Sequence, residues 1–286
     1  MKVTVLLVVY NGARHLSECI ESVLAQTYSS FEFLVVDDGS TDMTVDIVRG
    51  YNDSRIRLIM NHHDYIGSLN TGISLANGEY IARIDADDIM FPNRLAKQVV
   101  VMEKYSQVDV CGTWAVTFGR AFYSMSSFNG FVENPLSKLL LGNFMIHPTV
   151  MLRKDFLIRN HLQYKNYAYA EDFKLWTDIA IKNGTFYIIP EQLLKYRLSS
   201  EQVSCKHAKE QCDTGRRVQD EILIYILNDE RVQELDVFQN IYISLEKLNV
   251  ERRISRLVIM QVIAILYSAL LECQGESANN GSLINK

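Results

Sequence analysis

Three carboxylates that follow an apolar segment are the strongest chemical signal in this chain. Residues 80–84 are mostly apolar, and Asp85, Asp87 and Asp88 come directly after them. Like charges at one strand end repel one another unless a cation lies among them. Carboxylate oxygens are the ligands that hard divalent ions prefer. The sequence therefore predicts a Mn²⁺ or Mg²⁺ site here, and the alternative is an acidic turn on the surface.

A second acidic strand end lies upstream. Asp37 and Asp38 follow the apolar residues 33–36 and precede Gly39-Ser40. Taken alone, an ordinary turn before a helix explains this segment equally well, because Asp, Gly and Ser favour turns. Two acidic strand ends in the first ninety residues, however, imply a polar crevice at the carboxyl edge of a parallel sheet. Open α/β sheets bind their ligands at that edge.

Apolar segments typical of buried strands alternate with helical patterns over the first hundred residues. We expect strands at residues 3–9, 31–36, 56–60 and 79–84, each followed by a helix. Continuous apolar runs with β-branched residues indicate strands that are covered on both faces. The alternation predicts an α/β fold with a mostly parallel central sheet flanked by helices.

The pattern changes in the middle of the chain. Residues 112–142 are rich in Phe, Tyr, Ser and Gly, and we expect a loop or short hairpins over the crevice. Strands are predicted at 146–152 and at 185–189, the second ended by Pro190. A helix is predicted between them, at 173–181.

From about residue 212 onward the chain has a helical pattern. We therefore predict an α/β domain over residues 1–204 and a C-terminal helical region over residues 205–286. Residues 257–271 are nearly all apolar but fall short of the roughly 20 residues that span a membrane. A buried helix, a homodimer contact, and membrane-surface attachment through the preceding arginines at 252, 253 and 256 all remain open.

Composition narrows the class of protein. A charged fraction of 22% is typical of a folded protein, and 286 residues can bury a sizeable core. The net charge of −5 argues against a nucleic-acid partner, which usually requires a basic surface. Five scattered cysteines form no metal-binding or disulfide pattern. Reduced thiols, and hence a cytoplasmic location, are the expectation.

Six blocks follow one another in a characteristic order: Val8-Val9-Tyr10-Asn11, Val35-Val36-Asp37-Asp38-Gly39-Ser40, Leu69-Asn70-Thr71-Gly72, Asp85-Ala86-Asp87-Asp88, His147-Pro148-Thr149 through Arg153, and Ala170-Glu171-Asp172-Phe173-Lys174-Leu175-Trp176. Together they resemble family 2 glycosyltransferases of the GT-A fold. These enzymes transfer a sugar from a nucleotide-sugar with inversion at the anomeric carbon. The resemblance covers about residues 1–204.

The resemblance implies a donor site. It assigns donor and nucleotide contacts to Val8, Tyr10, Asn11, Asp38, Asn70, Arg83, Asp85, Ala86 and Asp87. Asp38 would hydrogen-bond the base, and Tyr10 would pack beside a uracil. Asp87 or Asp88 would hold the metal that bridges the two phosphates. Arg83 is equally well explained as a solvated charge at a strand edge.

The resemblance also implies a base. Inversion requires a proton acceptor on the face opposite the leaving group, and Asp172 matches that residue, with Glu171 as a contact to a sugar. Taken alone, both carboxylates would simply favour a helix N-terminus. His147 and Trp176 are candidate acceptor contacts, although each is also explained as a structural residue of the core.

One position departs from the family pattern. Many relatives carry a histidine two residues after the arginine of Lys195-Tyr196-Arg197, where this chain has Ser199. His207 is close enough in sequence to replace it.

The sequence thus predicts a metal-dependent inverting glycosyltransferase that uses a UDP-sugar. A hexose or N-acetylhexosamine would be transferred to a saccharide acceptor, lipid-linked as in capsule or O-antigen synthesis, at the inner face of the cytoplasmic membrane. A nucleotidyltransferase is the rival enzyme class, but residues 8–14 lack its glycine- and lysine-rich phosphate loop. A non-catalytic sugar-nucleotide-binding module is the third alternative.

Overall fold

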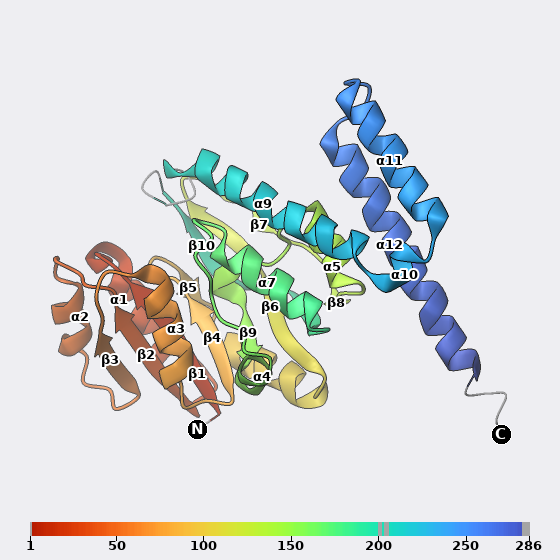
Figure 1. Cartoon of the computed structure of the whole chain (residues 1–286). Coiled ribbons are helices and arrows are strands. Elements are labelled where there is room, and N and C mark those ends of the chain that lie inside the picture. Colours follow the sequence, from red (N-terminus) through yellow and green to blue (C-terminus); the bar gives the residue numbers. More distant parts are fainter. Residues whose placement is uncertain (1, 200–201, 203–205, 282–286) are drawn as a thin grey trace. The chain divides into compact units, whose positions relative to one another are not determined.

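The computed structural model describes residues 2–199, 202 and 206–281, and it divides the chain into two units (Figure 1). The first comprises Met1–Val132 and Met145–Gln211, and the second comprises Glu133–Phe144 and Cys212–Lys286. The predicted domain boundary between residues 204 and 205 lies outside the described residues.

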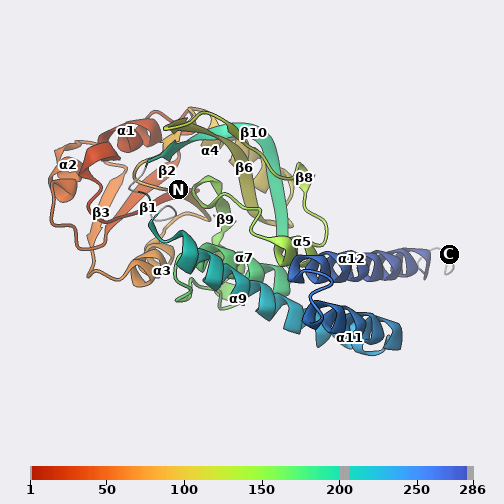
Figure 2. The same ribbon diagram turned by 90° about the horizontal axis from the view of Figure 1, so that it is seen from above.

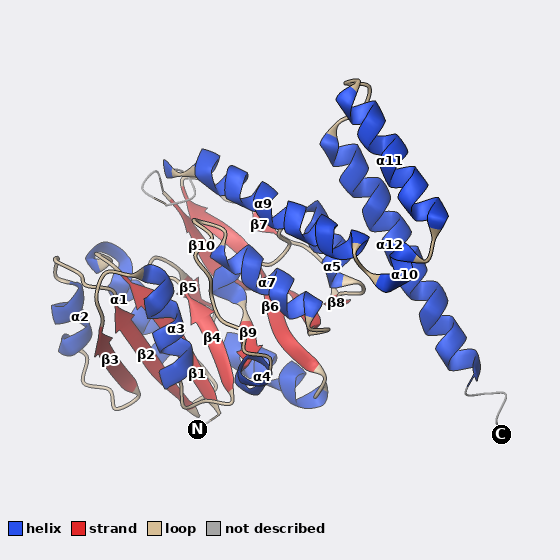
Figure 3. Cartoon of the chain, viewed as in Figure 1, coloured by secondary structure: helices blue, strands red, loops and turns tan. Residues whose placement is uncertain are grey.

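The first unit is built on one mixed sheet (Figure 3). Its strands are β1 (Val3–Val9), β2 (Phe31–Asp37), β3 (Ile56–Met60), β4 (Tyr80–Ile84), β5 (Ile89–Met90), β6 (Val108–Gly119), β7 (Ser124–Met125), β8 (Gly130–Phe131), β9 (Met151–Arg153) and β10 (Thr185–Leu198). The path β3-β2-β1-β4-β9-β6-β10-β5 places the four predicted N-terminal strands side by side. β1 pairs in parallel with β2 and β4, and β2 pairs in parallel with β3. The carboxyl ends of these four strands therefore share one edge.

Helices cover both faces of this sheet (Figure 2). They are α1 (Ala13–Leu24), α2 (Thr44–Gly50), α3 (Tyr65–Leu75), α4 (Arg94–Lys104), α6 (Lys154–Arg159) and α7 (Glu171–Ile181). All seven residues of β1 are buried, because its alternate side chains point to helices on opposite faces. On one face, Val5 belongs to the core that also contains Leu16 of α1 and Leu95 of α4. On the other, Leu6 lies so close to Gly72 of α3 that a Cβ at Gly72 would clash at 2.3 Å.

A buried glutamate joins the starts of three strands. Glu32 of β2 accepts hydrogen bonds from the Thr4 hydroxyl (2.6 Å) and from the backbone and side chain of Asn77 (2.6 and 2.8 Å). Arg57 lies 3.2 Å from Oε2, the oxygen that also accepts from the Asn77 side chain. Burial raises the pKa of Glu32, but these hydrogen bonds and the arginine outweigh burial, so the pKa is below its usual value. The ionised form therefore stabilises the fold.

We expect Glu32→Gln to lower the free energy of unfolding by about 1–3 kcal/mol, because the buried donors that bind the carboxylate in the parent lose their charged acceptor. A lowered folded-state pKa gives stabilisation that is present above the unfolded value and is lost as pH falls through the folded value. Urea unfolding at pH 7 and pH 4 should therefore show a smaller acid loss in the variant. Glu191→Gln, which breaks an exposed pair with Lys97, is the control and should change little. Equal acid losses in the parent and Glu32→Gln would contradict this role.

Three predictions for the middle of the chain differ from the structure in part. Residues 112–119 are not a loop but the second part of the twelve-residue strand β6. The predicted strand at 185–189 does not stop at Pro190 but continues as β10 to Leu198. Proline has no N–H to donate to a strand ladder, and the pairing of β10 with β6 shifts register between Ile189 and Gln192. The irregularity lets the strand pass the proline. The predicted strand at 146–152 is shorter, because residues 147–149 form a 3₁₀ turn, η1 (His147–Thr149), before β9.

The second unit is helical, as predicted. It contains α5 (Pro135–Leu141), most of α9 (Ala208–Leu227), α10 (Glu230–Gln233), α11 (Asp236–Val250) and α12 (Arg256–Gly281). The helix around residues 257–271 is longer than the sequence indicated. Its segment Arg256–Cys273 has the length and composition of a membrane span, although a soluble protein can contain such a helix as well.

Candidate active site

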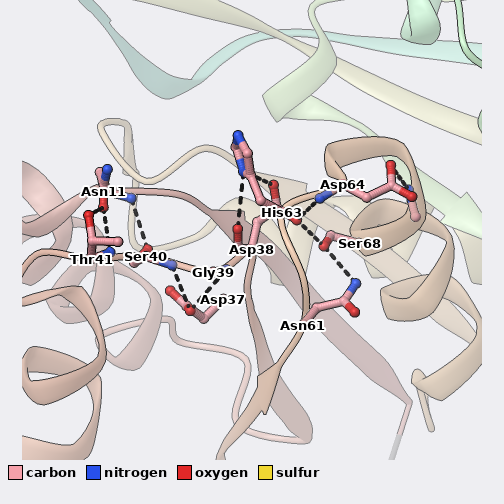
Figure 4. A network of polar contacts seen from close by, with 11 residues as sticks. Asn11, Asp37, Asp38, Gly39, Ser40, Thr41, Asn61, His63, Asp64 and Ser68 are labelled. Atoms are coloured by element: carbon pink, nitrogen blue, oxygen red, sulfur yellow. Dashed lines mark hydrogen bonds and ion pairs between the residues drawn. The ribbon is translucent and has the colours of Figure 1, made fainter.

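The turns after β1 and β2 hold each other in place at the carboxyl edge of the sheet (Figure 4). Asn11 has a positive φ of 50°, and its side-chain oxygen accepts a hydrogen bond from the Thr41 N–H (2.8 Å). The Asn11 N–H donates to the Ser40 hydroxyl oxygen (2.9 Å). Asp37 accepts from the N–H groups of Gly39 and Ser40 through one carboxylate oxygen. These contacts fix the backbone beside Tyr10 and Asp38.

Asp38 connects the end of β2 to the loop after β3. One of its carboxylate oxygens accepts hydrogen bonds from the Asp64 N–H (2.9 Å) and the Ser68 hydroxyl (2.5 Å). Its second oxygen lies 3.1 Å from Nδ1 of His63. The side chain is almost completely buried. The first oxygen thus has two donors, and the second is the one available to a further donor.

Tyr10 and His63 form an aromatic ledge above Asp38. Their rings stack with centroids 4.0 Å apart and an angle of 29° between their planes. Tyr10 is 46% exposed, and the His63 side chain is 63% exposed. Rings this close leave no space for a third ring between them, so a planar base can stack only on an outer face or in place of His63.

The three motif carboxylates after β4 have different environments. Asp85 forms an ion pair with the buried Arg83 (2.7 Å), and Asp88 accepts a hydrogen bond from the Arg197 N–H (2.9 Å). The other Asp88 oxygen is buried and has no partner among the described residues. Asp87 has no ion pair with a described side chain, and desolvation together with the charge of Asp85 raises its pKa to about 6.

These residues fit a divalent ion that also binds the ligand. Within the described ranges, no three His, Cys, Asp or Glu side chains converge as a complete metal cage. Mg²⁺ characteristically takes one or two carboxylates and fills its remaining positions with phosphate oxygens and water. The unpaired Asp87 and the unpartnered oxygen of Asp88 supply such carboxylates, and a cation would relieve the repulsion that raises the pKa of Asp87.

Two arginines support the acidic motif from inside the protein. The Arg83 guanidinium reaches the Tyr65 hydroxyl (3.2 Å) as well as Asp85, so it is not a solvated strand-edge charge. Arg94 is also fully buried and donates to the Arg83 carbonyl oxygen (2.8 Å). Desolvation lowers the pKa of Arg94 to about 9, while the charge of Asp88 opposes this shift.

Glu171 and Asp172 occupy the first turn of α7, where the helix dipole favours negative charge. Desolvation and the charge of Asp172 raise the pKa of Glu171 to about 7, and Asp85 adds to the shift. The carboxylate pair is therefore within electrostatic range of the acidic motif. One oxygen of Asp172 accepts a hydrogen bond from the Phe173 N–H (2.6 Å). A carboxyl near neutrality beside a second carboxylate is typical of acid–base sites.

The two candidate acceptor residues belong to one aromatic cluster. Nε2 of His147 lies 2.8 Å from the Tyr164 hydroxyl, and the His147 and Trp176 rings meet edge to face at 6.0 Å. Desolvation lowers the pKa of His147 to about 3, so the ring is neutral. Trp176 is fully buried, as the core interpretation expected. Asn70, a predicted donor contact, binds the backbone of Tyr164. Its side-chain N–H donates to the Tyr164 carbonyl oxygen, and its side-chain oxygen accepts from the Tyr164 N–H (2.9 Å each).

The remaining predicted positions are also located. Val8 is buried in β1, opposite Val36, and Ala86 is half-buried beside the core. The Ser199 N–H donates to the Gln202 side chain (3.1 Å). His207 stacks on Tyr169, two residues before Glu171, with ring centroids 4.3 Å apart. This places His207 beside the segment that leads into α7.

Sequence reasoning missed His63, Ser68, Tyr65 and Tyr164. The sequence did contain a signal for His63. It follows β3, and because β3 is parallel to β2, the residues after both strands must lie at the same edge of the sheet. The pairing of Tyr164 with Asn70, 94 positions away, has no local signal.

Known proteins resemble this chain in both sequence and structure. The model of the family described as Glycosyl transferase family 2 matches residues 4–160. A glycosyltransferase of Haemophilus influenzae is 32% identical over 241 residues, which cover 79% of this chain and 74% of the relative. The UDP-Glc:α-D-GlcNAc-diphosphoundecaprenol β-1,3-glucosyltransferase WfgD of Escherichia coli is 32% identical over 211 residues, which cover 73% and 81%. TarS of S. aureus, in complex with UDP-GlcNAc, superposes with a TM-score of 0.67 at 21% identity, covering 80% of this chain and 68% of TarS.

The likeness to TarS shows the GT-A fold, which is built on a Rossmann-like sheet. The family model covers more than half of the chain and agrees with the relatives found by sequence. This protein therefore belongs to glycosyl transferase family 2, as its six sequence blocks predicted. Divalent metal is in general use in that family.

Proposed function

We propose that this protein is a metal-dependent inverting transferase that moves a hexose or N-acetylhexosamine from a UDP-sugar to a lipid-linked saccharide. The observation that carries the proposal is that Glu171, next to Asp172 in the first turn of α7, lies within electrostatic range of Asp85 in the acidic motif. It combines a site for a diphosphate with a proton acceptor. The similarity to the glucosyltransferase WfgD and to TarS, which binds UDP-GlcNAc, supports this choice of donor and acceptor.

Each group has a defined task in this proposal. The ledge of Tyr10 and His63 stacks the uracil, and Asp38 accepts from its ring N–H through the oxygen that faces His63. Asp87, with Asp88, would hold a divalent ion, which supplies charge neutralisation for the diphosphate and for the departing UDP. Arg83 holds Asp85 in place through their ion pair. Asn70 and His147 position Tyr164.

Transfer is a single displacement. The acceptor hydroxyl oxygen forms a bond to the anomeric carbon as the bond from that carbon to the β-phosphate oxygen breaks. Asp172 takes the hydroxyl proton, and UDP leaves with the electron pair of the broken bond. Because attack and departure occur on opposite faces, the anomeric configuration inverts.

The same comparison supports a proposal for the acceptor and for its location. WfgD acts on a diphosphoundecaprenol-linked sugar, and we propose an acceptor of this class presented at the cytoplasmic face of the membrane. Cys19 and Cys111 are buried free thiols, which fits a reducing compartment.

Incubation with Mn²⁺ and a panel of UDP-sugars, followed by measurement of released UDP, tests the donor class. One UDP-sugar should be hydrolysed or transferred much faster than the others, and UDP-glucose, UDP-galactose and UDP-N-acetylhexosamines form the panel. A matched panel of GDP- and TDP-sugars is the control. Turnover confined to those nucleotides would refute the proposed donor.

Tyr10→Ala should weaken UDP binding by about 1–3 kcal/mol, the usual contribution of one stacked base. Tyr10→Phe keeps the ring and should bind UDP normally. Isothermal titration calorimetry measures both affinities. Unchanged binding by the alanine variant would place the uracil elsewhere.

A further inference from the structure

One residue from a distant strand contacts both carboxylate positions that fit a divalent ion. The acidic turn, Asp85–Asp88, follows β4, whereas Arg197 lies near the end of β10. Nε of Arg197 donates to the backbone carbonyl oxygen of Asp87 (2.8 Å). The Arg197 backbone N–H donates to Oδ1 of Asp88 (2.9 Å). Arg197 therefore holds the backbone of one candidate metal ligand and the side chain of the other.

The register of the sheet places Arg197 beside this turn. β5 begins directly after Asp88 and pairs antiparallel with β10, with Ile89 opposite Lys195. Arg197 comes two residues after Lys195, at the point where the acidic turn continues the line of β5. On the other side of β10, Arg197 is paired with Phe118 of β6, and its guanidinium carbon lies 4.3 Å from the centre of that ring. The side chain is thus fixed by two neighbouring strands and not by a loop.

A third element offsets the charge of Arg197. Its Nη2 lies 2.5 Å from the carboxylate of Glu18 in α1, and the Arg197 side chain is only 13% exposed. Desolvation and the charge of Asp85 raise the pKa of Asp87, and the charge of Arg197 opposes this shift. The guanidinium is therefore within electrostatic range of the Asp87 carboxylate, yet it forms its ion pair with Glu18. This arrangement holds the backbone of Asp87 and leaves its carboxylate available.

We propose that Arg197 is a positioning residue for the divalent ion, a role that rests on the metal site proposed above. It fixes the backbone from which the Asp87 carboxylate extends. By occupying Oδ1 of Asp88, it leaves Oδ2, which is buried and has no partner among the described residues. Groups that orient metal ligands typically contribute a factor of about 10–100 to metal affinity.

The charge of Arg197 by itself would have the opposite effect. A cation beside carboxylates repels a second cation, so a neutral residue at this position would strengthen Mn²⁺ binding if only charge mattered. The unpaired Glu18 would add to that gain. A positioning role predicts weaker binding, because the acidic turn loses a contact that orders it. A role in strand stability alone predicts a lower melting temperature with unchanged Mn²⁺ binding.

Calorimetric titration of the full chain with UDP at a series of Mn²⁺ concentrations separates these possibilities without measuring sugar transfer. The half-point is the Mn²⁺ concentration that gives half of the gain in UDP affinity. Arg197→Gln should raise the half-point by about 10–100-fold. Its UDP affinity in EDTA should match that of the parent, because Tyr10 and Asp38, the proposed uracil contacts, have other partners.

Glu18→Gln tests the ion pair that directs the guanidinium away from Asp87. It should raise the half-point by about two- to fivefold, in line with the modest strength of partly exposed pairs. The Glu18 side chain is 56% exposed, so this substitution leaves the core intact.

Arg153→Gln is the matched control. The Arg153 side chain is also 13% exposed and lies over an aromatic ring, that of Tyr80. Its guanidinium likewise donates to backbone carbonyl oxygens, those of Val108 (3.0 Å) and Met102 (3.1 Å). Because Arg153 pairs with Tyr80 at the start of β4, it lies at the opposite end of that strand from the acidic turn. This variant should lower the melting temperature and leave the half-point unchanged.

An unchanged or lower half-point in folded Arg197→Gln would overturn the positioning role. If circular dichroism shows that this variant is unfolded, Glu18→Gln decides, and a parental half-point there would overturn the role as well. A parent whose UDP affinity does not respond to Mn²⁺ would instead refute the proposed metal site, and the role of Arg197 with it.

Discussion

Replacing Asp172 with asparagine is expected to lower the turnover number for sugar transfer by about 10²–10⁴, the usual loss for a general base. Asparagine keeps the size of the side chain and an oxygen that can accept the hydrogen bond from the Phe173 N–H. What it removes is the carboxylate that we propose as the acceptor of the hydroxyl proton. UDP-sugar affinity should change little, because the base acts on the acceptor hydroxyl and not on the diphosphate. Single-turnover transfer beside calorimetric donor binding separates the two effects.

Glu171→Gln is the matched comparison for this variant. The pKa of Glu171 is raised to about 7, so the residue is largely protonated just below neutral pH, and glutamine resembles that form. Turnover of Glu171→Gln at pH 6.5 should therefore remain within about tenfold of the parent. If Asp172→Asn transfers sugar within about threefold of the parent, the base lies elsewhere, and Glu171 becomes the next candidate.

The second large effect concerns divalent metal. UDP binding by the parent should strengthen at least about tenfold, or about 1.4 kcal/mol, when Mn²⁺ or Mg²⁺ is added. Asp87→Asn should lose this enhancement, because Asp87 is the motif carboxylate without an ion pair to a described side chain. Titration with UDP in Mn²⁺ and in EDTA measures both affinities for each protein.

Asp64→Asn is the control for the metal prediction. It makes the same acid-to-amide change near the same sheet edge, and asparagine still caps α3 as Asp64 does through the Gly67 N–H. The metal enhancement should persist in this variant. Equal UDP affinity of the parent with and without metal would remove Asp87 from the proposed metal site.

The elements with strong local patterns were predictable. The apolar runs of β1, β2 and β4 consist of consecutive residues, because a strand buried on both faces needs apolar side chains throughout. The acidic residues that end β2 and β4 follow directly in the sequence. Once these strands are parallel neighbours, Asp38 and Asp87 must share an edge. The helix that carries Glu171 and Asp172 was likewise predictable from its own periodicity. The family resemblance added the expectation that these two carboxylates belong to the same site as the acidic strand ends.

Local pattern gave the wrong end for one strand. Pro190 normally stops a strand, yet β10 continues past it, because pairing with β6 on the far side of the register shift offsets the missing N–H. The second half of β6 was mistaken for a loop for a related reason. Its side chains alternate too weakly to indicate a strand, and its pairing with β10 is what holds it extended.

By itself, the sequence determined the class of fold, the acidic ligand edge and the identity of the carboxylates, since residue type and spacing set all three. Only the tertiary structure decided which motif carboxylate has no protein partner among the described side chains. Asp85 forms an ion pair with Arg83, and one oxygen of Asp88 accepts from the Arg197 N–H, whereas Asp87 forms no ion pair. Likewise, only the structure brought His63 onto Tyr10 and Asn70 onto Tyr164. Such pairings depend on strand register and on the path of the loops. Both are set by packing between distant segments, so the residues next to each partner in the sequence do not predict them.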